Sequence, residues 1–261
     1  MELSDRSMEA LVARFHARFG SAAMGSTPDE RALSAIETAL NREIDVYRDR
    51  LKVGFPKEAS ERLQEMLGRL PREATPYIAY RIQANIGHCL LQLSDVPGGL
   101  TWLEKAVESA PREPKAIATK AFAHIIRKEF SEAIEFAQHE LAVDSNNEDL
   151  AAHLIEACID LDDGTDPEPI IPIALWERER VLVARCLLYR HRGGQPTWWA
   201  VAQLGAKRFP ENHLLKLFAA EAEVDQIARA TRNDTYRPLT DHERSILRKA
   251  AETLDAIFSL R

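Results

Sequence analysis

Residues 80–113 read YRIQANIGHCLLQLSDVPGGLTWLEKAVESAPRE, and residues 114–147 read PKAIATKAFAHIIRKEFSEAIEFAQHELAVDSNN. Each of these 34-residue stretches contains two helix-forming segments separated by a short break. In the first stretch, the small residues Gly87, Gly99 and Ala106 lie among larger apolar residues. Small residues let two helices approach closely, and larger ones fill the space to the next pair. The pattern predicts stacked helical hairpins with tight contacts at these three positions.

The same pattern recurs elsewhere in the chain. In residues 114–147 it is carried by Ile117, Ala121, Ala133 and Ala137. Looser copies end near Pro71 and Pro210. This internal repeat resembles the tetratricopeptide repeat, whose 34-residue helical hairpins stack into a superhelix. The resemblance extends over about residues 30–230, is most specific over 80–145, and implies an α-solenoid.

Helical periodicity with regular breaks continues through the rest of the chain. Helices are expected near 4–19, 29–52, 57–70, 76–93, 97–110, 114–128, 131–144, 148–161, 173–191, 196–208, 211–230 and 241–260. No stretch combines strand-like alternation with turn signals on both sides. We therefore expect an all-α fold, with antiparallel helical hairpins stacked as a TPR-like α-solenoid.

One segment departs from the repeat. Three prolines and four acidic residues within Asp162–Pro172 disfavour a helix there. The solenoid is therefore expected to be interrupted by an exposed, mobile loop, with the second helix of that hairpin missing or displaced. The expected organisation is an N-terminal helix and linker over 1–28, the solenoid over 29–161, the loop over 162–172, and C-terminal hairpins with a cap over 173–261.

Composition restricts the classes of partner and compartment. Apolar residues make up 45% of the 261 residues, so a sizeable core can be buried. The net charge of −7 gives no broad attraction to nucleic acid or to anionic lipid. The sequence contains neither a recognisable secretory signal nor an apolar run of about 18 residues, which a membrane helix needs. Three widely spaced cysteines suggest reduced thiols and a cytoplasmic location.

Residue types that carry chemistry do not form a recognisable catalytic or metal motif in the sequence. His153 and Glu156 share a helix face, but a single pair of this kind is more often an ordinary hydrogen bond. The acidic loop near Gly164 lacks acids where a calcium loop needs them. We therefore expect no metal, no cofactor and no catalytic residue.

The resemblance also predicts where a partner binds. In the tetratricopeptide family, the first helix of each hairpin lines a concave groove. The groove residues predicted in this way are Arg48, Lys52, Arg81, Asn85, His88, Lys115, Thr119 and Phe122. They are mostly cations and amides, which suit an acidic peptide or a terminal carboxylate. Arg81 and Lys115 are expected to be exposed. The carboxylate clamp of some family members is incomplete, because Ile44 and Thr119 replace basic residues.

These observations predict a non-catalytic module, a scaffold or adaptor that binds a peptide or protein in its groove. The alternative is a regulatory or sensor subunit that controls a separate enzyme. Trp198 and Trp199 are expected mainly in the core, with an aromatic contact surface as the other possibility. The N-terminal helix Ser4–Phe19 is expected to cap the solenoid or to dock onto a partner.

Overall fold

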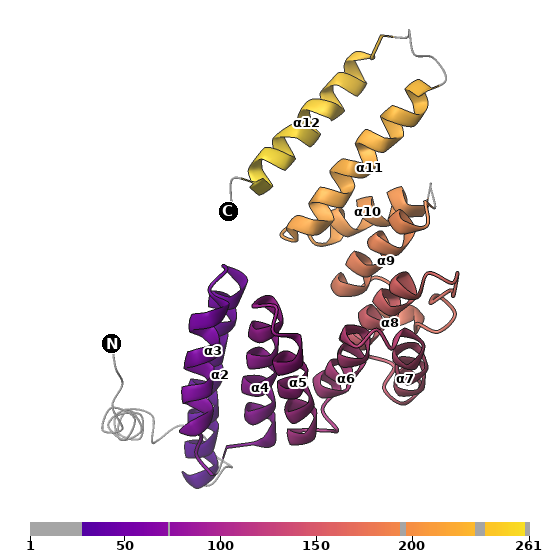
Figure 1. Ribbon diagram of the computed structural model, residues 1–261. Helices are drawn as coiled ribbons and strands as arrows, with labels where there is room; N and C mark the ends of the chain where they lie inside the picture. Colours follow the sequence, from indigo (N-terminus) through magenta and orange to yellow (C-terminus); the bar gives the residue numbers. More distant parts are fainter. Residues whose placement is uncertain (1–27, 73, 194–196, 233–237, 259–261) are drawn as a thin grey trace. The chain divides into compact units, whose positions relative to one another are not determined.

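The computed structural model describes residues 28–72, 74–193, 197–232 and 238–258 (Figure 1). Over these residues the chain forms eleven α-helices, one short 3-10 helix and no strand, which confirms the all-α prediction. The α-helices are α2 Pro28–Lys52, α3 Pro56–Gly68, α4 Pro76–Gln92, α5 Val96–Ser109, α6 Pro114–Ile126, α7 Phe130–Val143, α8 Glu148–Leu161, α9 Glu179–His191, α10 Thr197–Arg208, α11 His213–Arg232 and α12 Asp241–Phe258. The helix expected at 4–19 lies outside the described residues. None of the described helices is both long and apolar enough to cross a membrane.

Local capping explains several helix starts. The Asp95 carboxylate accepts a hydrogen bond from the Gly98 amide at 3.0 Å and caps α5. At α12, the Glu243 carboxylate accepts a hydrogen bond from the Thr240 amide at 2.7 Å, and the Thr240 hydroxyl accepts one from the Glu243 amide at 3.2 Å. This reciprocal pair is a capping box.

The chain divides into two compact units, Met1–Ala123 and His124–Arg261. The division falls within α6, whereas the sequence suggested a change of organisation at residues 162–172. In the first unit, α3 packs against both α2 and α4, and α4 packs against α5. Buried residues from α2, α3 and α4, including Ile44, Leu63 and Ile82, form its main core.

The hairpin of α4 and α5 contains the closest approach between helices that the repeat pattern predicts. A Cβ atom at Gly87 would lie 2.9 Å from the Leu103 side chain and 3.0 Å from the Gly99 carbonyl oxygen. A Cβ atom at Gly99 would lie 2.7 Å from the Leu91 side chain and 3.1 Å from the Gly87 carbonyl oxygen. Ala106 is fully buried. The prediction of tight helix contacts at these small residues is confirmed.

In the second unit, α8 and α9 pack against each other as a parallel pair. At their N-terminal ends, the Arg180 amide donates to the Glu148 carboxylate at 2.7 Å. At their C-terminal ends, the His191 ring contacts the Asp162 carboxylate at 2.8 Å. Residues 162–178 carry the chain from the end of α8 back to its start. In a regular repeat, the second helix of the hairpin would follow α8. Residues 162–178 take its place, in agreement with the predicted break in the repeat.

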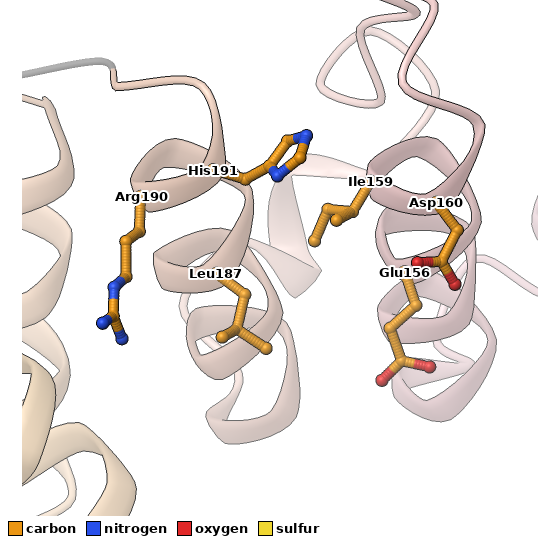
Figure 2. Close-up of a pocket in the computed structure, with 6 residues that line it drawn as sticks. All are labelled: Glu156, Ile159, Asp160, Leu187, Arg190 and His191. Carbon is orange, nitrogen blue, oxygen red and sulfur yellow. The ribbon is translucent and has the colours of Figure 1, made fainter.

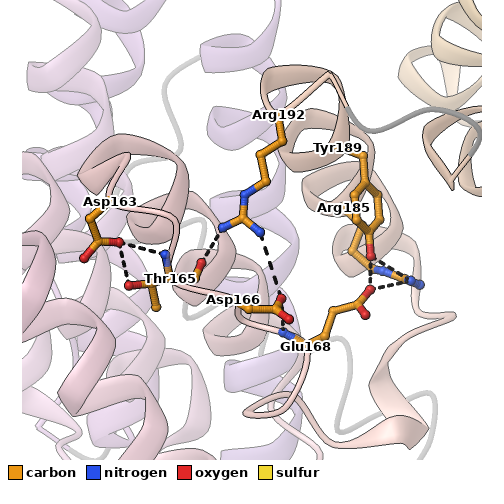
Figure 3. A network of polar contacts seen from close by, with 7 residues as sticks. All are labelled: Asp163, Thr165, Asp166, Glu168, Arg185, Tyr189 and Arg192. Carbon is orange, nitrogen blue, oxygen red and sulfur yellow. Dashed lines mark hydrogen bonds and ion pairs between the residues drawn. The ribbon is translucent and has the colours of Figure 1, made fainter.

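The connection differs from the predicted elements in its second half. The helix expected over 173–191 begins only at Glu179, and residues 173–175 form a 3-10 turn. The connection also contacts α9 through several polar side chains (Figure 3), and its mobility stays a prediction. The guanidinium of Arg185, whose side chain is only 11% exposed, lies 3.1 Å from the Glu168 carboxylate and donates to the Trp176 carbonyl at 3.2 Å. Arg192 donates to the Thr165 carbonyl. The side chains of α9 thus contact the loop at several points.

Candidate functional site

The first helices of the first unit lie side by side, as the predicted groove requires. Arg81 on α4 contacts Asn41 and Asp45 on α2, and His88 on α4 lies against Phe122 on α6 with ring centroids 5.4 Å apart. These contacts connect residues between 34 and 40 positions apart in the chain, close to the repeat length. We call the surface formed by Arg48, Arg81, Asn85, His88, Lys115 and Phe122 the first-helix face.

Arg81 is not exposed, and the sequence-based expectation is wrong on this point. Its side chain is 14% exposed, because the guanidinium turns toward α2 and donates to the Asp45 carboxylate at 2.6 Å. The same Asp45 oxygen lies 3.2 Å from the Arg48 guanidinium. The Arg48 Nε atom is buried and makes no hydrogen bond with any described residue. Two guanidinium groups therefore share one carboxylate, which leaves a local excess of positive charge.

The other predicted groove residues have different environments. Thr119 is only 7% exposed, and its hydroxyl is 2.9 Å from the Tyr80 hydroxyl, so it joins two helices instead of facing a groove. The Asn85 side-chain amide donates to the Arg81 carbonyl at 2.7 Å. Lys52 is exposed and pairs with Asp49, whereas Lys115 is exposed and has no ion pair with any described residue. Lys115 and Arg48 are therefore the accessible cations best placed for a ligand.

A pocket of about 510 Å³ lies in the second unit, between α8 and α9. Its lining residues are Glu156, Ile159, Asp160, Leu187, Arg190 and His191 (Figure 2). We call it the α8–α9 pocket. Sequence reasoning missed it, although the His153–Glu156 pair pointed to the same face of α8. That pair is a 2.7 Å contact between the His153 ring and the Glu156 carboxylate. Among the described residues, no group of three or more histidine, cysteine, aspartate or glutamate side chains could hold a metal ion.

Most contacts of the loop lie on the face of α9 opposite to the α8–α9 pocket. An α-helix turns by about 100° per residue, so Arg185, Tyr189 and Arg192 share one face. These three residues contact the loop. The lining residues Leu187 and Arg190 fall on the opposite face. These contacts of the loop therefore lie on the side of α9 opposite to Leu187 and Arg190, while His191 of the pocket lining contacts Asp162 at the start of the connection.

The two adjacent tryptophans belong to the core of the second unit. Trp198 is 4% exposed, and Trp199 packs against the same apolar cluster of α9, α10 and α11. The Trp199 indole donates to the Asp225 carboxylate at 3.2 Å. This agrees with the core role expected for them, and neither ring forms an exposed aromatic surface.

The three cysteines are buried and free. Burial raises the pKa of Cys89 and of Cys158 to about 11, and that of Cys186 to about 12. The thiolate is the reactive form of cysteine, so burial suppresses nucleophilic chemistry at all three positions. The pKa of each thiol is higher in the folded protein than in the unfolded chain, where it is near 9. The contribution of these thiols to folding stability is therefore fully present below pH 9 and is lost as the pH rises through 11 to 12.

We expect iodoacetamide at pH 8 to leave all three thiols unmodified in the folded protein, because both access and thiolate population are low. In guanidinium chloride, all three should react. Mass spectrometry of the intact protein counts the added groups. Rapid modification of one cysteine in the folded state would contradict its burial.

Comparison with models of known protein families gave no match to this chain, and comparison with curated proteins gave none either.

Proposed function

We propose that this protein is a non-catalytic, peptide-binding repeat module of the tetratricopeptide kind, and that it binds acidic peptide segments on its first-helix face. The observation that carries this proposal is the sharing of one Asp45 oxygen by the guanidinium groups of Arg48 and Arg81. A carboxylate of a ligand would provide the second anion that this arrangement lacks. Charge-assisted hydrogen bonds of this kind are stronger than neutral ones.

Neighbouring features support a peptide as the ligand. The rings of His88 and Phe122 lie against each other across α4 and α6 and provide an apolar contact about two helical turns from Arg81 along α4. The exposed Lys115, on α6, adds a third cation. Contacts at separations close to the repeat length support the assignment to the tetratricopeptide class, in which first helices share a face. Binding to such a surface suits an extended acidic segment with apolar side chains.

A charge-reversal experiment tests the proposal. The probe is a fluorescein-labelled peptide of alternating glutamate and leucine residues with a free terminal carboxylate. The double variant Arg48→Glu/Lys115→Glu should bind it about tenfold more weakly than the natural protein, which corresponds to about 1.4 kcal/mol. Arg81 is kept, because its buried pairing with Asp45 supports the fold. Fluorescence anisotropy gives both affinities.

The matched control is Lys57→Glu/Lys207→Glu, which changes the net charge equally at exposed positions on α3 and α10. This control should bind the glutamate–leucine peptide within about twofold of the natural affinity. Equal loss in both double variants would mean that overall charge drives the binding, and the first-helix face would be rejected as the site. Unchanged affinity in Arg48→Glu/Lys115→Glu would reject it as well.

A further inference from the structure

We propose that the α8–α9 pocket is a second peptide site, and that it takes a basic side chain, lysine or arginine, together with a neighbouring apolar one. The inference rests on the proposed function only in that the ligand is again a peptide. The two sites differ in charge, lie on different helices and can be tested separately.

Acidic groups dominate the charge of the α8–α9 pocket. Glu156 and Asp160 line it from α8. The Asp160 carboxylate makes neither a hydrogen bond nor an ion pair with any described residue, and it is exposed. Glu156 contacts only the Nδ1 atom of His153 among the described residues, at 2.7 Å. Neither carboxylate is paired with a lysine or an arginine of the described chain.

The basic residues of the lining are already engaged by acids. The Arg190 guanidinium lies 3.0 Å from Glu221 on α11, and Figure 2 shows its side chain extending away from α8. The His191 ring lies 2.8 Å from Asp162. Arg190 and His191 are thus each paired with a carboxylate from outside the pocket lining. Asp160 is the acidic lining residue that makes no ion pair with a described residue.

The C-terminal end of α8 adds to the negative potential. The C-terminal end of an α-helix carries a partial negative charge of about half an elementary unit. The end of α9 lies on the same side and carries Arg190 and His191 in its last turn, so only the end of α8 lacks basic side chains. The last turn of α8 contains no basic residue, and it contains Asp160. A cation from a ligand would meet this helix end and two carboxylates together.

An apolar floor lies next to these charges. Figure 2 shows Ile159 of α8 and Leu187 of α9 in the space between the two helices. Leu187 is 39% exposed, so its side chain is accessible to a ligand in the pocket. The volume of about 510 Å³ is in the range of small-ligand pockets and accommodates two adjacent side chains. A lysine or arginine beside a leucine-like residue fits both the charges and the floor.

Three labelled peptides provide the test: an amidated hexapeptide of alternating lysine and leucine, an amidated hexapeptide of alternating lysine and serine, and the glutamate–leucine peptide with a free terminal carboxylate that tests the first-helix face. The natural protein should bind the lysine–leucine peptide at least about fivefold more tightly than the lysine–serine peptide, because leucine buries apolar surface. Asp160→Lys should weaken lysine–leucine binding about tenfold, and Leu187→Ser about fivefold. Asp160→Lys should fold normally, since a cation suits the end of a helix.

Two matched controls separate a site from general attraction. Glu135→Lys makes the same charge change at an exposed position of α7, and Leu204→Ser removes a leucine that is 37% exposed on α10. Both should leave lysine–leucine binding within about twofold. The proposal is overturned if Asp160→Lys binds as the natural protein does, or if Glu135→Lys loses as much affinity as Asp160→Lys.

The peptides also distinguish this inference from the proposed function. If the glutamate–leucine peptide binds through Arg48 and Lys115 but the lysine–leucine peptide does not bind, the α8–α9 pocket alone is rejected. If only the lysine–leucine peptide binds, and Asp160→Lys weakens that binding about tenfold, the pocket is supported and the first-helix face is rejected. Free spermine should not displace the lysine–leucine peptide at equal concentration, because it lacks the apolar side chain; displacement would mean a site for simple amines.

Discussion

Replacing Gly87 with leucine should lower the free energy of unfolding by about 3 kcal/mol, the upper part of the range for overpacked helix contacts. The reason is the position that a Cβ atom would occupy, 3.0 Å from the backbone oxygen of Gly99 and 2.9 Å from Leu103. The Leu103 side chain could move, but the Gly99 backbone moves only if α4 and α5 separate. Thermal unfolding should show a fall in Tm of roughly 6–12 °C.

Gly68 provides the control for the Gly87 substitution. It also lies in a helix, at the end of α3, but a Cβ atom there would meet nothing within 4 Å. Gly68→Leu should therefore change stability by less than about 0.5 kcal/mol. Should Gly87→Leu fail to fold, Gly87→Ala still provides a measurable and smaller loss. Equal Tm values for Gly87→Ala and Gly68→Ala would contradict the close contact of α4 and α5.

Replacing Arg185 with alanine should destabilise the protein by about 2–3 kcal/mol and release the connection 162–178. Its guanidinium pairs with Glu168 at 3.1 Å, donates to the Trp176 carbonyl and lies over the rings of Trp176 and Tyr189, 5.2 and 5.6 Å from their centroids. Removing one partner of a buried pair costs about 3–5 kcal/mol, and Glu168 is one-third exposed, which reduces the figure. Chemical denaturation measures the loss.

The same variant should become sensitive to proteolysis within residues 162–178, since a released loop is a preferred site of cleavage. Arg229→Ala is the control, because its pair with Asp225 on α11 is more exposed and should contribute less than about 1 kcal/mol. Glu168→Gln keeps the packing around Arg185 and removes only the charge, so an intermediate effect is expected. Identical cleavage patterns for Arg185→Ala and the natural protein would show that Arg185 does not hold the loop.

Helix positions follow closely from local sequence signals. The predicted helix 148–161 coincides with α8, and the prediction of 76–93 exceeds α4 by one residue. Both begin at local signals, an Asn147 cap and a proline after Thr75. The helix predicted from 173 is the exception. Ile171 and Leu175 are buried, and the Trp176 indole donates to the Ile171 carbonyl at 3.1 Å, so tertiary packing holds these residues in a tight turn.

The candidate sites followed from the sequence only in part. The repeat register correctly placed Arg81, His88 and Phe122 on neighbouring first helices, because residues one repeat apart occupy equivalent positions. It did not predict that the Arg81 side chain turns toward Asp45, or that the Thr119 hydroxyl forms a hydrogen bond with the Tyr80 hydroxyl. The rotamer of a long side chain depends on the partners that the fold brings near it, and these lie about 40 residues away in the chain.

The sequence by itself determined the all-α class, most of the helix boundaries and the close contact of α4 with α5, because periodicity, caps and small residues act over one or two helical turns or within one repeat. Only the tertiary structure decided that α8 and α9 run parallel. The direction of α9 depends on the path of residues 162–178, and that path is held by Arg185 and Arg192 on a helix later in the chain. The α8–α9 pocket is lined by residues of both helices and depends on that parallel arrangement, so no single stretch of sequence predicts it.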